Sequence, residues 1–86
     1  MIVQISDELF WGFKVNFDET HYKSFNELAF FVKKELILFL RINNLLNLQE
    51  IAEKINLHNH EFKSYEEMIK SNKNIIYLCG GCKAMV

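Results

Sequence analysis

The sequence predicts an α+β domain in which a mixed sheet of four to five strands packs on one long helix. Three features of the chain point to this fold: alternating hydrophobicity near the N-terminus, a long amphipathic segment that follows a helix-capping motif, and a short apolar segment near the C-terminus. Half of the 86 residues are hydrophobic and none is proline. This composition excludes a disordered or collagen-like chain and predicts one domain spanning residues 1–86, either a whole protein or an excised part of a longer one.

The first two strands are expected to form a hairpin. Residues 2–5 are mostly β-branched, and residues 6–8 supply a polar turn. From Trp11 to Phe17 the chain alternates between aromatic or β-branched residues and small or polar ones. A period of two is typical of a strand with one buried face.

A long helix follows the hairpin. Ser24 and Glu27 have the spacing of a capping box, and apolar residues then recur on one helical face for about 17 residues, as far as Arg41. Phe30 and Ile37 lie on the opposite face. We expect the segment 41–49 to cover them, and a partner or self-association surface is the alternative.

The segment 45–57 supports two interpretations. Leu45, Leu48, Ala52 and Ile55 have helical spacing, whereas Ile51, Ile55 and Leu57 fit one face of a strand. Periodicity alone leaves these two equal.

The C-terminal part is expected to end in a central strand. Residues 58–60 resemble a turn, and Ser64 with Glu67 forms a second capping box that opens a brief helical turn. Ile75–Leu78 is apolar on both faces, which indicates a strand inside a sheet. Such a strand can pair with the first strand of the chain, as in the β-grasp arrangement of ubiquitin-like folds.

The charge, the apolar runs and the cysteine content of the chain exclude several classes of function. The net charge of −1 argues against nucleic-acid binding, and no apolar run is long enough to suggest a membrane partner. Cys79-x-x-Cys82 and His58-x-His60 supply the ligand types of a zinc site, but structural roles for these residues are the expected outcome. Gly80-Gly81 is likewise expected to end a strand rather than to serve as a conjugation signal. We therefore expect no enzyme, no catalytic residue, no metal and no cofactor. Two cysteines give no disulfide framework, which favours the reducing cytoplasm.

Several motifs, in order and at matching spacing, resemble the doublecortin domain, a family with the ubiquitin-like β-grasp fold. They are Phe10-x-Gly12, the segment Tyr22–Leu28, and the closing segment Tyr77–Gly81. The resemblance implies that residues 51–57 form the third strand. It also implies a non-enzymatic module that binds tubulin and organises or stabilises microtubules in the cytoskeleton, for example in a cilium. Other cytoskeletal or signalling proteins are further partners to consider.

Tubulin surfaces are acidic, so exposed lysines are the candidate contacts. These are Lys14, Lys23, Lys33, Lys34, Lys63, Lys70 and Lys73. The near-neutral net charge predicts weak binding by one domain alone. The alternative is a ubiquitin-like interaction module that binds another protein through Phe30 and Ile37 instead of tubulin.

Overall fold

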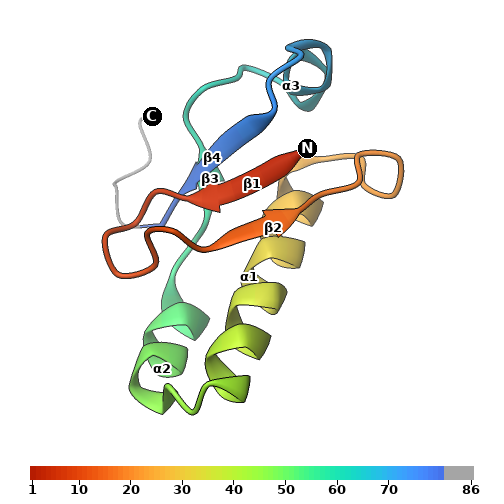
Figure 1. Cartoon of the computed structure of the whole chain (residues 1–86). Helices are drawn as coiled ribbons and strands as arrows, with labels where there is room; N and C mark the ends of the chain where they lie inside the picture. Colours follow the sequence, from red (N-terminus) through yellow and green to blue (C-terminus); the bar gives the residue numbers. More distant parts are fainter. Residues whose placement is uncertain (81–86) are drawn as a thin grey trace.

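The computed structural model describes residues 1–80. It contains four strands and three helices (Figure 1). In chain order these are β1 (Ile2–Ile5), β2 (Lys14–Asn16), α1 (Phe25–Ile42), α2 (Leu46–Lys54), β3 (His58–Asn59), α3 (Tyr65–Lys70) and β4 (Ile75–Cys79).

The strands form one mixed sheet in the order β2-β1-β4-β3. β1 is antiparallel to β2 and parallel to β4, and β3 is antiparallel to β4. The α+β class and the mixed sheet are therefore confirmed, with four strands among residues 1–80. The central position of Ile75–Leu78 beside the N-terminal hairpin is also confirmed, because Ile2 lies opposite Ile75 and Ile5 lies opposite Leu78.

The core lies between one face of the sheet and α1. Gln4 of β1 is buried on the other face of the sheet. The core residues alternate along β1 and β4 and are spaced four apart along α1. They are Val3, Ile5, Ile76 and Leu78 from the strands, and Leu28, Val32, Leu36 and Leu40 from the helix. The other face of the sheet is more open, since Tyr77 on β4 is exposed.

The capping motif of α1 forms as expected. The Ser24 hydroxyl accepts a hydrogen bond from the Glu27 N–H at 3.3 Å, and the Glu27 carboxylate accepts one from the Lys23 N–H at 2.7 Å. The helix ends at Ile42 with Asn43 as its C-cap, and Asn44 takes a left-handed conformation with φ of 59°. Asparagine tolerates this conformation, which is a common way to end a helix.

The third strand is not where the resemblance placed it. Residues 46–54 form α2, so the prediction of a strand over 51–57, and of only one helix besides a brief turn, was wrong. Burial follows the helical pattern and not the strand pattern: Ala52 of the helical pattern is fully buried, whereas Ile51 of the strand pattern is 39% exposed. α2 packs beside α1 (Figure 1), and β3 begins only at His58.

Two further boundaries differ from the sequence prediction. Strand β2 is confined to residues 14–16, and Trp11 is 64% exposed rather than on a buried strand face. Gly12 explains why β2 starts later than expected, because its φ of 94° belongs to a turn and not to a strand. His58 and Asn59, expected in a turn, pair with β4 instead.

No helix among residues 1–80 has the length and apolar character needed to cross a membrane.

The second capping box is confirmed: the Ser64 hydroxyl accepts a hydrogen bond from the Glu67 N–H at 3.1 Å at the start of α3. The predictions made for Gly81 and Cys82 fall outside the described residues.

Candidate protein-binding face

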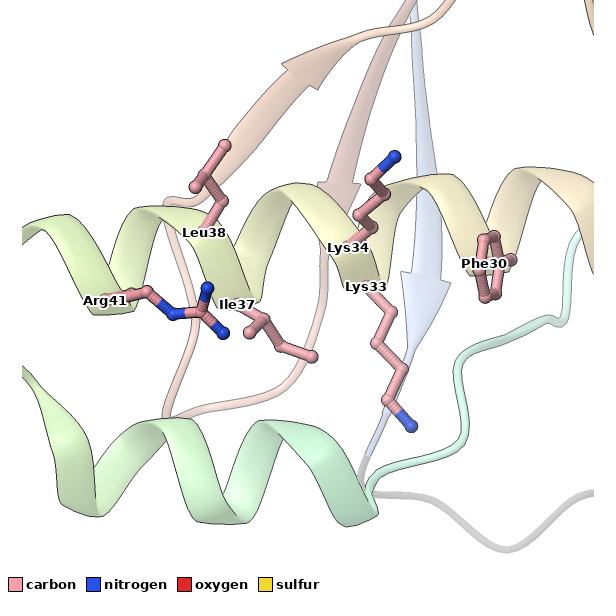
Figure 2. Close-up of a pocket in the computed structure, with 6 residues that line it drawn as sticks. All are labelled: Phe30, Lys33, Lys34, Ile37, Leu38 and Arg41. Carbon is pink, nitrogen blue, oxygen red and sulfur yellow. The ribbon is translucent and has the colours of Figure 1, made fainter.

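The outer side of α1 carries a hollow of about 410 Å³ in which apolar and basic side chains alternate (Figure 2). We call this surface the basic face of α1. It consists of Phe30, Lys33, Lys34, Ile37, Leu38 and Arg41.

Helical periodicity produces this face. The residues recur at intervals of three and four, which places them on one side of a helix. The buried series begins at Leu28, two positions before Phe30, and two positions correspond to a rotation of about 200°. α1 thus has one apolar face that packs on the sheet. Its opposite face, which points away from the sheet, carries both apolar and basic residues.

The apolar members of the basic face are only partly covered. Phe30 is 72% exposed and Leu38 is 46% exposed, whereas Ile37 is partly buried against the core. Figure 2 shows Ile37 and Lys33 extending toward α2, and Leu38 and Lys34 on the other side of the helix. The expected coverage by the segment 41–49 was therefore wrong for Phe30, because α2 turns back beside the C-terminal half of α1 and leaves the N-terminal half open.

The charge of the basic face has one sign. Lys33, Lys34 and Arg41 contribute three cations, and no carboxylate belongs to the lining. Exposed apolar side chains beside cations can bind a partner that is apolar at its centre and acidic at its margin.

The other predicted lysines lie on separate elements. Lys14 is on β2 opposite Gln4, and Lys23 precedes α1. Lys63 precedes α3, and Lys70 is the last residue of α3. Lys73 forms an ion pair with Glu61 at 2.6 Å and lies 5.5 Å from the centre of the Phe62 ring. The basic face thus unites Lys33 and Lys34 of the lysine candidates with both partner-surface candidates, Phe30 and Ile37.

Sequence reasoning missed two members of this face, Leu38 and Arg41. The missing signal was the continuation of the stripe beyond Ile37, since positions 30, 34, 37, 38 and 41 share one side of a helix. Arg41 was considered only as the end of the helix. Its planar guanidinium makes it a stronger partner for carboxylates than a lysine.

A second exposed feature is aromatic and was also missed. The rings of Trp11 and Tyr77 stack at 6.4 Å with an angle of 6° between their planes. Tyr77 lies opposite Gln4 of β1, on the sheet face that α1 does not cover. These side chains bring no charge with them, so they offer less specificity for an acidic partner.

Among residues 1–80, two side chains have a shifted pKa, and both lie outside the basic face. Hydrogen bonds from Thr20 lower the pKa of Asp18, and His21 adds to the effect. Burial raises the pKa of Tyr65 to about 12, and the nearby carboxylates of Glu19 and Glu27 act in the same direction. The Tyr65 hydroxyl donates a hydrogen bond to the Tyr22 carbonyl oxygen at 3.1 Å, so this side chain has a structural role.

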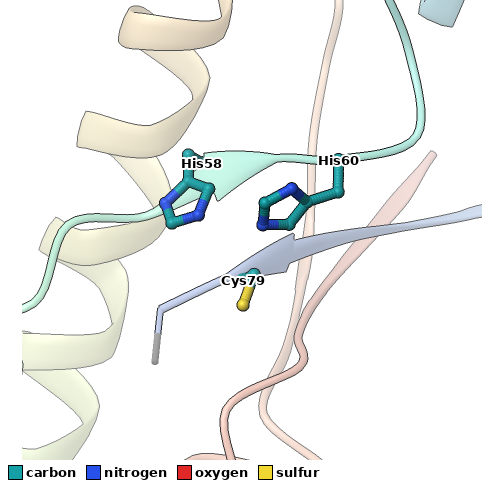
Figure 3. Close-up of side chains that lie close together, drawn as sticks. All are labelled: His58, His60 and Cys79. Carbon is teal, nitrogen blue, oxygen red and sulfur yellow. The ribbon is translucent and has the colours of Figure 1, made fainter. Parts of the chain in front are cut away.

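The histidines and one cysteine that suggested zinc in the sequence come together in the fold. One potential ligand atom from each of His58, His60 and Cys79 lies within 4.8 Å of the others (Figure 3). Cys79 takes part in a disulfide, which the cysteine content had not led us to expect. This cluster lies at the β3–β4 edge, on elements separate from the basic face.

Comparison of the chain with models of protein families, with curated proteins and with solved structures gives no match. The function is therefore inferred from the residues themselves.

Proposed function

We propose that this protein is a non-enzymatic binding module that docks an acidic protein surface on the basic face of α1. The single observation behind this proposal is the union of three cations with exposed apolar side chains on one helix face that has no carboxylate in its lining. Aromatic residues and arginine are enriched among the residues that dominate binding at interfaces. Phe30 and Arg41 occupy such roles at the two ends of the face.

Tubulin is the partner that the resemblance to the doublecortin domain suggests. In this proposal the fold is a β-grasp, and the strand order β2-β1-β4-β3 with parallel β1 and β4 supports it. The added helix α2 is a departure from the pattern that the resemblance implied. The module would stabilise microtubules by binding the assembled lattice more tightly than free tubulin, because a ligand shifts an equilibrium only by its differential affinity.

Three cations on one face give modest affinity. Exposed ion pairs contribute about 0.2–1 kcal/mol each, and salt screens them. A single domain is therefore expected to bind microtubules weakly and in a salt-dependent manner. A second copy or a basic extension would raise the affinity through avidity.

The test is cosedimentation with stabilised microtubules over a series of salt concentrations. The wild-type protein should pellet at low salt and be released as salt increases. Lys34→Glu should weaken binding about three- to tenfold, because it replaces an attraction by a repulsion. Lys14→Glu is the matched control: it makes the same charge change at an exposed position on the sheet face that α1 does not cover.

Equal loss in Lys34→Glu and Lys14→Glu would show that net charge, or a contact at Lys14, governs binding as much as the basic face does. Absence of pelleting at low salt would remove tubulin as the partner. Neither result would bear on the description of the fold. Circular dichroism of each variant checks separately that it is folded.

A second candidate function is a ubiquitin-like interaction module whose partner is not tubulin. The 72% exposure of Phe30 favours it, since a large ring left in solvent is better explained by an apolar anchor than by charge steering alone. A partner lost on Phe30→Glu while microtubule binding is retained would support this alternative.

A further inference from the structure

We propose that His58, His60 and Cys79 form a binding site for one zinc ion in the reduced protein. The site lies at the edge of the sheet where β3 meets β4 (Figure 3). It is independent of the basic face and of the proposed partner.

The local geometry of the strands brings the three side chains together. His58 lies directly opposite Cys79 in the antiparallel pair β3–β4, and such partners point to the same face of a sheet. His60 follows His58 by two residues, one position beyond the end of β3, and Figure 3 shows its ring beside that of His58. The sequence His-x-His opposite a cysteine is therefore sufficient to cluster three metal-binding groups.

The distances fit a zinc site after a small adjustment. The ligand atoms lie within 4.8 Å of one another. Bond lengths of about 2.0–2.3 Å in a tetrahedral site require ligand atoms about 3.3–3.8 Å apart. Side-chain rotations that shift the ligand atoms by about 1–1.5 Å therefore close the site. The two imidazole rings are 4.5 Å apart between centres and nearly perpendicular, an arrangement in which both can direct a nitrogen at one point.

The environment of His58 orients it as a ligand. Its Nδ1 lies 3.1 Å from the Asn56 carbonyl oxygen, which can only accept a hydrogen bond. Nδ1 is then the donor in this contact, and Nε2 would be the nitrogen that binds the metal. A backbone carbonyl that fixes the tautomer in this way is a typical outer partner of metal-binding histidines.

Metal choice follows from the ligand types. Imidazole and thiolate together suit zinc, whereas magnesium and calcium prefer oxygen ligands. His60 is exposed and the other two are partly buried, so an ion can enter from solvent. Cys82 stands three residues after Cys79 in the sequence, outside the described part of the chain.

The redox state of Cys79 controls the site. Its disulfide must take up two electrons and two protons from a cellular dithiol, which becomes a disulfide in turn, to give two thiols. Zinc then displaces the proton of the Cys79 thiol and binds the thiolate. The oxidised protein should therefore bind zinc far more weakly than the reduced one.

The consequence for the fold is local. β3 has two residues and lies at the edge of the sheet, so it makes few backbone contacts of its own. An ion held jointly by β3, His60 and β4 stabilises this edge, because a ligand that binds only the folded state raises its stability.

The experiment measures zinc bound by the full chain after reduction with a phosphine and desalting without oxygen. One equivalent is expected in the reduced protein and much less in the oxidised protein. With cobalt chloride in place of zinc, a sulfur-to-cobalt charge-transfer band should report the thiolate ligand. The melting temperature of the reduced protein should rise on addition of zinc.

Three variants and one control locate the site. Cys79→Ser, His58→Gln and His60→Gln should each lower the affinity by more than about tenfold, since even a lost outer-shell partner costs about 10–100-fold. His21→Gln is the matched control, because His21 is the third histidine of the chain and contacts Asp18 in a separate loop. His60→Gln changes an exposed residue and should leave the fold intact.

The proposal is wrong if the reduced protein binds no zinc at micromolar concentrations. It is also wrong if His21→Gln lowers the affinity as much as His60→Gln does, or if the cobalt complex lacks the sulfur band. Circular dichroism of the metal-free variants separates a lost ligand from a lost fold.

Discussion

The two faces of α1 share one backbone and one N-cap but have different environments. On the face toward the sheet, Leu28, Val32 and Leu36 are almost completely buried. On the basic face, Phe30 and Leu38 are largely exposed and stand among cations. The core explains the apolar residues of the first face, whereas on the second face only Ile37 is partly buried against the core. The same residue types thus serve stability on one side, and on the other they are available for binding.

The largest effect should come from truncating the buried face. Leu36→Ala should lower the free energy of unfolding by about 2–5 kcal/mol, because it removes buried methyl groups and leaves a cavity between α1 and the sheet. Chemical denaturation measures the loss. A change below about 1 kcal/mol would mean that α1 is not packed on the sheet as described.

The N-cap supports both faces, so its loss should have an intermediate effect. Ser24→Ala removes the hydroxyl that accepts from the Glu27 N–H and should cost about 1 kcal/mol. Ser64→Ala removes the equivalent bond of α3 at 3.1 Å and serves as the comparison. The residues of the basic face belong to α1 and not to α3. Ser24→Ala should therefore also weaken binding to the partner, whereas Ser64→Ala should not.

Tyr65 connects the buried side of α1 to α3, and it predicts a change in stability at alkaline pH. Its ring lies edge-on to that of Phe25, 5.7 Å between centres, and its pKa is raised from 10.0 to about 12. Folding therefore favours the protonated hydroxyl. This contribution is complete below pH 10 and is lost as the pH rises toward 12.

Tyr65→Phe isolates that contribution. The variant loses the hydrogen bond to the Tyr22 carbonyl, which should cost about 0.5–1.5 kcal/mol at neutral pH. Between pH 10 and pH 12 its free energy of unfolding should fall less steeply than that of the wild-type protein. Parallel curves for the two proteins would show that another group causes the alkaline loss.

The sequence predicts α1 well because local signals agree there. The capping box at Ser24, the apolar period and the two asparagines after Ile42 all indicate the same helix. The pairing of the chain ends was also predictable, since Ile75–Leu78 is apolar throughout. These elements make up most of the core.

α2 and the metal-binding cluster were less predictable for a physical reason. Helical and strand patterns were equal over residues 45–57, and only the burial of Ala52 against other elements decides between them. The cluster depends on which residue lies opposite His58, and that register is a tertiary property. The basic face was partly predicted: Phe30, Ile37, Lys33 and Lys34 were noted separately, but whether α2 covered them depended on the path of the chain after α1.

The smallest change in stability should come from the basic face. Phe30→Ala removes a ring that is 72% exposed, so the free energy of unfolding should change by no more than about 0.5 kcal/mol. Binding to the partner should nevertheless fall about tenfold or more, because truncation of an aromatic anchor at an interface typically costs over 1 kcal/mol. The pair Leu36→Ala and Phe30→Ala therefore separates the roles of the two faces, one measured by denaturation and the other by cosedimentation at low salt. If Phe30→Ala instead destabilised the protein by 2 kcal/mol or more, the ring would be part of the core and the open face would not exist.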